Sequence, residues 1–209
     1  MMEAQEIING LQRIVDKYSV FAIAWHAVLY VFIIALVAKW KPSGKLMALF
    51  MCLPLVSVAI FSWMDGNPFN GTMFSILAAL VLVFGLKASS QPVSTSKLVF
   101  VIAGILMVAF GMLYPHFVDN TLLTWLHASP VGLIPCPTLS LIIGFALVYN
   151  GFGSRNISLL LTAFGLFYGI FGVFKLAVYL DLFLVFGSVM LFLSRFKIFQ
   201  INKLSTINY

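Results

Sequence analysis

Imidazole and thiol side chains are scarce in this 209-residue chain, which has three histidines and two cysteines. Imidazole nitrogen and thiolate sulfur are the ligands that borderline or soft transition-metal ions prefer. The cysteines lie far apart, so the CxxC spacing of a zinc ribbon is missing and a disulfide is not indicated. One hypothesis is therefore a transition-metal ion held by side chains from distant segments, with four candidate ligands: His26, His116, His127 and Cys136.

Carboxylate and aromatic side chains form a second candidate set, suited to a small solute or a cation. All six carboxylates fall in connections that we assign below to one side of a membrane, where their field would attract a cation. We predict an outward-facing polar vestibule on that side. Besides the metal-ligand candidates, its predicted lining is Trp25, Tyr30, Tyr114, Asp119 and Asp181.

Cys136 lies between two prolines, Pro135 and Pro137. Because proline fixes its own φ and restricts the preceding residue, this strip is stiff. It could present a thiolate or a backbone carbonyl to an ion, or it could simply start a helix at a required angle. A membrane thiol-redox enzyme that uses Cys136 is the first alternative to solute binding. It requires a reactive thiol with a lowered pKa.

Structural roles compete with each of these functional readings. His26 lies on one helical face with Ala22 and Tyr30, four residues away on either side, and a histidine in such a position can form an interhelical hydrogen bond instead of binding a ligand. Lys175 and Asp181 could pair with each other or cap adjoining helices, since a carboxylate is favoured at a helix N-terminus. Gly165 and Gly169 form a GxxxG pattern, which indicates a close helix contact inside the protein.

The composition places the chain in a membrane. Hydrophobic residues make up 62% of it and charged residues only 9%, against roughly 25% charged residues in soluble domains. No basic stripe interleaved with aromatics indicates a nucleic-acid partner. The sequence contains no Walker loop, no GxSxG and no histidine pair spaced for haem, so we predict no catalytic residue and favour a protein that is not an enzyme.

Seven apolar runs approach the roughly 20 residues that a spanning helix needs. The predicted fold is all-α: a polytopic membrane helix bundle, one domain over residues 1–209, with residues 114–132 as an extracytoplasmic connection or lid. A short polar lead before the first span is expected to lie on the surface as an amphipathic turn. The predicted spans are residues 18–37, 46–63, 72–86, 98–113, 133–149, 157–174 and 182–196.

The basic residues orient this bundle, because cytoplasmic connections retain lysine and arginine. Three of the 12 basic residues fall on the side of the N-terminus and nine on the other side. We therefore expect the N-terminus outside and the C-terminus in the cytoplasm. The carboxylates all fall on the outer side: Glu3, Glu6, Asp16, Asp65, Asp119 and Asp181.

Several of these residues also form a pattern that resembles a known family. Tyr114-Pro115, a connection, then Pro135-Cys136-Pro137-Thr138 opening a helix, with Asp181 before the last span, resembles a domain of unknown function in small bacterial multi-pass membrane proteins. The first helix, with Trp25 and Tyr30, is also similar. The family tends to have Gly-His before its Tyr-Pro, where this chain has Gly111, Met112 and Leu113. The resemblance implies a helical fold in a bacterial inner membrane, and no activity.

The leading hypothesis is an inner-membrane protein that binds or transports a small solute or a cation through the vestibule. A second alternative is an accessory subunit without chemistry of its own, whose phenylalanine-rich surface contacts a membrane-protein partner or a second copy of the chain. The expected surroundings are the lipid bilayer in all cases.

Overall fold

The computed structural model describes residues 3–118 and 121–195. Over these residues the chain forms eight α-helices, two short 3₁₀ turns and no β-strand. Four of the helices, α1, α2, α3 and α7, are long and apolar enough to cross a membrane. The α-helices are α1 (Ala4–Val37), α2 (Gly44–Met64), α3 (Pro68–Leu86), α4 (Leu98–Met112), α5 (Leu122–Ala128), α6 (Pro135–Val148), α7 (Arg155–Leu176) and α8 (Leu182–Leu193).

Short polar residues define where the helices begin. The side chains of Ser43, Asn67 and Ser154 accept hydrogen bonds from backbone N–H groups in the first turns of α2, α3 and α7. Helix α6 begins instead at Pro135. Proline suits the first helical position because it lacks a backbone N–H, and an N–H at that position would have no partner within the helix. A helix occupies each of the seven segments predicted to span the membrane, although residue 196 of the last lies outside the described residues.

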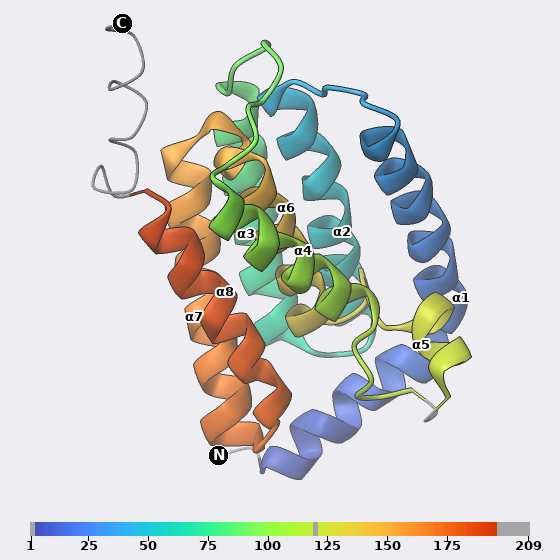
Figure 1. Ribbon diagram of the computed structural model, residues 1–209. Helices are drawn as coiled ribbons and strands as arrows, with labels where there is room; N and C mark the ends of the chain where they lie inside the picture. The colour runs from blue at the N-terminus through green and yellow to red at the C-terminus, as the bar shows by residue number, and fades with distance from the viewer. Residues whose placement is uncertain (1–2, 119–120, 196–209) are drawn as a thin grey trace, which may run out of the picture.

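Two segments differ from the structure that the sequence predicts. Helix α1 begins at Ala4 and continues through the polar lead, with a kink at Tyr18. Figure 1 shows its first part crossing the end of the bundle and its later part standing along the side. The connection over residues 114–132 contains the short helix α5, which packs against α1. The lead is therefore a helical N-terminal segment, residues 4–17, rather than a turn.

Helix α6 forms the centre of the bundle. Twelve of its 14 residues are buried, and it contacts α2, α4, α7 and α8. Its contact with α4 is close because glycines face each other: a Cβ added to Gly144 would lie 2.7 Å from the carbonyl oxygen of Gly104. At 1.5 Å per residue α6 is about 21 Å long, shorter than the roughly 30 Å of bilayer hydrocarbon.

The glycines of α7 pack against α8, as the GxxxG pattern predicts. A Cβ on Gly165 would contact the Ser188 side chain, and one on Gly169 would contact Val185 at 2.7 Å. The internal-packing interpretation of this pattern is thus confirmed. One turn further along α7, Gly172 faces Asp181.

The helix connections gather at two opposite ends of the bundle (Figure 1). At one end Ser43 pairs with Pro92, and Asn150 bonds to Ser96 and to Arg195. The connections α1–α2, α3–α4 and α6–α7 and the end of α8 therefore lie together. The other end carries the N-terminal segment, the α2–α3 turn, the connection after α4 and the turn between α7 and α8.

Candidate functional site

A buried carboxyl group is the centre of the candidate site. Asp181 is 1% exposed, and both of its oxygens accept hydrogen bonds from side chains. The Tyr114 hydroxyl donates to Oδ1 at 2.9 Å, and the Cys136 thiol donates to Oδ2 at 3.2 Å. Three residues that are far apart in sequence, all of them candidates from the sequence, thus form one cluster.

Helix ends bring these three residues together. Tyr114 follows the end of α4, Cys136 is the second residue of α6, and Asp181 directly precedes α8. The turn at Asp181 is reached because Ala177 ends α7 in the left-handed conformation, with φ of 56°. Gly172 makes room for the carboxyl group, since a Cβ there would overlap Asp181 Oδ2. Asp181 precedes α8 as expected, but its side chain makes no capping hydrogen bond.

The cluster forms part of the wall of a cavity of about 250 Å³. Most of the wall is apolar and much of it is aromatic, contributed by α1, α3, α7, the start of α6, the connection after α4 and the turn between α7 and α8. A mostly apolar pocket with a few convergent polar groups is the usual form of a small-molecule site. The lining residues are Ile7, Leu11, Asn67, Phe69, Asn70, Tyr114, Phe117, Ile134, Pro135, Cys136, Tyr168, Phe171, Gly172, Leu176, Val178 and Asp181.

The N-terminal segment covers the cavity from the end of the bundle. Ile7 and Leu11 line the cavity from this segment. Arg13 Nε and Lys17 Nζ each lie 3.6 Å from a carboxylate oxygen of Asp65 in the α2–α3 turn. These two ion pairs and a hydrogen bond from Gln12 to the Phe117 carbonyl hold the segment in place. The 114–132 connection, expected from the sequence to form a lid, also contributes Tyr114 and Phe117 to the cavity wall, so α1 and this connection lie against the cavity together.

A second polar pair in the cavity wall was missed from the sequence. The Tyr168 hydroxyl donates a hydrogen bond to Asn70 Oδ1 at 2.9 Å, and both residues are buried. Asn70 lies in the first turn of α3, two residues before the predicted start of the third span at residue 72. Its position beside an apolar run is the signal that could have identified Asn70, because an amide side chain buried at such a position needs a hydrogen-bond partner.

The other predicted lining residues lie elsewhere. Trp25 donates to Ser57 Oγ at 2.9 Å and packs against Gly132, and Tyr30 donates to the Leu126 carbonyl. Both residues fasten α1 to its neighbours and neither lines the cavity. Asp119 falls outside the described residues. Of the predicted vestibule, the cavity thus includes Tyr114 and Asp181, with Cys136 from the metal-ligand set.

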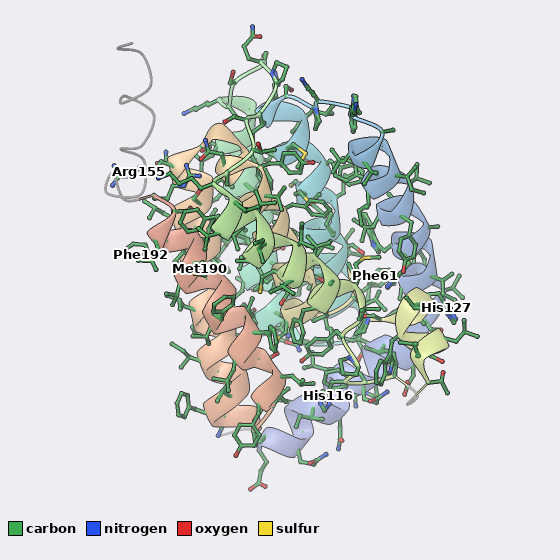
Figure 2. The ribbon with its side chains drawn as sticks, in the orientation of Figure 1. Phe61, His116, His127, Arg155, Met190 and Phe192 are labelled. Carbon is green, nitrogen blue, oxygen red and sulfur yellow. The ribbon has the colours of Figure 1, made fainter. Side chains whose placement is uncertain are left out.

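The histidines are not gathered at the cluster. His26 is buried, with Nδ1 2.9 Å from the Ala22 carbonyl oxygen and Nε2 3.0 Å from that of Met112. It links α1 to the end of α4, so the interhelical hydrogen bond expected of His26 is formed, with the Met112 carbonyl. Figure 2 shows His116 and His127 well apart, and Arg155 towards the other end of the molecule. Among the described residues, no group of three or more His, Cys, Asp or Glu side chains could hold a metal ion.

The surroundings of the site change its acid–base chemistry. Burial raises the pKa of Asp181, in the turn between α7 and α8, to about 6, although the bonds from Cys136 and Tyr114 act in the opposite direction. Burial, with Cys136 and Asp181 nearby, raises the pKa of Tyr114 well above its usual value. The phenol therefore remains a hydrogen-bond donor. Burial also lowers the pKa of His116, which lies outside the cavity wall.

Replacing Gly172 by alanine should displace the Asp181 carboxyl group. The new Cβ would occupy space that Oδ2 now fills, so the hydrogen bond from Cys136 should break. We expect a loss of about 1–3 kcal/mol in stability, typical of overpacking, measured by thermal unfolding in detergent. In an Asp181→Ala background the conflict is absent, and Gly172→Ala should be close to neutral. Equal costs in both backgrounds would contradict the contact.

Protein-family models, curated proteins and solved structures were all compared with this chain, and none of them matches it.

Proposed function

We propose that this chain is a multi-pass inner-membrane protein that binds a small, mostly apolar solute with one polar or cationic group in the cavity beside Asp181. The observation that carries the proposal is the cluster of Tyr114, Cys136 and Asp181 in an otherwise apolar cavity wall. Burying a carboxyl group is costly unless its environment or a ligand compensates it. A solute with a hydrogen-bond donor or a positive charge would do so.

We also propose seven spans, with the N-terminus outside and the C-terminus in the cytoplasm. Support comes from the connections α1–α2, α3–α4 and α6–α7, which meet at one end of the bundle and together carry or adjoin six of the 12 lysine and arginine residues. The cavity lies at the other end, where the N-terminal segment covers it. In this orientation the solute reaches the cavity from the outer side, and passage across the membrane would need a further opening towards the cytoplasmic end.

A thiol-redox function finds less support in the site. A redox thiol acts as a thiolate, whereas the Cys136 thiol donates a hydrogen bond to a carboxyl group whose ionised form would repel a thiolate. The second cysteine, Cys52 on α2, donates a hydrogen bond to the Ala78 carbonyl on α3, and neither cysteine forms a disulfide. The site therefore favours recognition of a solute over thiol exchange.

Binding can be tested with two probes of one shape, benzyl alcohol and benzylammonium. We expect either probe to raise the unfolding temperature of the purified protein in detergent by about 3–6 °C at ten times its dissociation constant. Ile7→Trp should fill the cavity and remove the shift. Asn9→Trp places the same side chain on the exposed side of the N-terminal segment and should preserve it. Absence of any shift up to the solubility limit of both probes would refute the proposal.

A further inference from the structure

Among the residues that the structure describes, the cavity wall contains an acid but no basic side chain to balance its charge. The groups in its wall that can titrate are Tyr114, Cys136, Tyr168 and Asp181, and no lysine, arginine or histidine lines it among the described residues. Tyr114 and Cys136 face Asp181 from the ends of α4 and α6. On α1 the wall residues are the apolar Ile7 and Leu11. An ionised Asp181 would therefore lack a positive partner inside the cavity.

The hydrogen bonds at Asp181 leave room for a ligand. Each carboxylate oxygen has two lone-pair sites, and Tyr114 and Cys136 use one on each oxygen. The remaining sites could accept the N–H groups of an ammonium ion. Phe69, Phe117 and Phe171 line the same cavity, and aromatic faces attract organic cations. The apolar wall suits the hydrocarbon part of such a ligand.

We propose that the cavity exchanges one proton on Asp181 for one small organic ammonium ion. This inference rests on the proposed function and names its ligand class. In the empty cavity the carboxyl group is protonated at acidic pH; when the cation binds, the O–H bond breaks, the proton leaves to water, and the carboxylate pairs with the ammonium group. The total charge in the cavity is the same before and after exchange. The buried site thus avoids both an unpaired carboxylate and an unpaired cation, each of which is costly.

The pKa of Asp181 sets the pH range of this exchange. Because burial raises that pKa to about 6, the empty site carries a proton below pH 6 and has lost it above. Below pH 6 the cation must displace the proton, so its apparent affinity should fall about tenfold for each further pH unit. Above pH 6 no proton is displaced, and the affinity should reach a plateau.

Calorimetry in two buffers of different ionisation enthalpy measures the released protons directly. For benzylammonium we expect about 0.9 proton per bound ligand at pH 5 and less than about 0.1 at pH 7.5, which follows from a pKa of about 6. Benzyl alcohol, the neutral probe of the same shape, should release none at either pH. Asp181→Asn should bind benzylammonium at least about 30-fold more weakly and still bind benzyl alcohol.

The outcomes separate this inference from the proposed function. If both probes bind but benzylammonium releases no proton at pH 5, proton exchange is wrong while solute binding stands. The same conclusion follows if Asp181→Asn binds benzylammonium as tightly as the unsubstituted protein. If neither probe binds, both proposals fail. The buffer comparison needs only the unsubstituted protein, so it decides the question even if Asp181→Asn does not fold.

Discussion

Substituting valine for Gly144 should leave little folded protein. A Cβ at this position would lie 2.7 Å from the Gly104 carbonyl oxygen and 2.7 Å from the Val108 backbone nitrogen. Backbone atoms cannot move aside as a flexible side chain can, so α4 and α6 would have to separate. Since α6 is the centre of the bundle, we expect a loss of at least about 3 kcal/mol, the upper end of the overpacking range.

Size-exclusion chromatography and thermal unfolding in detergent would measure this loss. Gly10→Val is the matched control, because a Cβ on Gly10 meets only the tip of the Arg13 side chain, at 3.8 Å. That variant should behave like the unsubstituted protein. A Gly144→Val protein that elutes as one species and unfolds within a few degrees of the control would show that α4 and α6 do not approach so closely.

Replacing Asp65 by lysine should open the cavity to reagents from water. Arg13 and Lys17 now pair with Asp65, and a lysine there would repel both and release the N-terminal segment. Cys136, partly exposed and in the cavity wall, reports the opening. In a Cys52→Ser background, we expect a membrane-impermeant maleimide to label Cys136 about tenfold faster or more, the change that 1.4 kcal/mol produces.

Reversing the charges of Arg13 and Lys17, the partners of Asp65, provides the control for this experiment. A protein with Asp65→Lys, Arg13→Glu and Lys17→Glu carries the same pairs with their signs exchanged, and its labelling rate should return towards the original. If all three proteins react at one rate, the N-terminal segment does not control access. A general loss of stability would accelerate labelling in both variants, and the charge-swapped protein distinguishes that case.

The helices could be predicted from the sequence because hydrocarbon imposes a length on every apolar run. The cluster was predicted only in part. Cys136 was a candidate as a thiol ligand, and Tyr114 and Asp181 were candidates as aromatic and carboxylate groups on the side assigned to the N-terminus. Which of the candidates touch depends on how the helices cross, which hydropathy does not encode.

The incorrect or missing parts have identifiable reasons. The N-terminal segment was expected to be an amphipathic turn, whereas it is a helix in which Ile7, Leu11 and Ile14 recur at the spacing of one helical face. His26 was grouped with metal ligands by residue type, but both of its ring nitrogens face backbone carbonyls. Asn70 and Tyr168 are single polar residues beside apolar runs, and only their contact with each other marks them.

The short central helix has a consequence for how the protein responds to its lipid. Helix α6 is surrounded by other helices, so its 14 residues need not match the width of the hydrocarbon layer. Thicker or thinner bilayers act on the tilt of the outer helices, which bear the hydrophobic mismatch. Cys136 lies at the start of α6. Protein contacts therefore fix its depth beneath the protein surface, and this depth should not change with the thickness of the membrane.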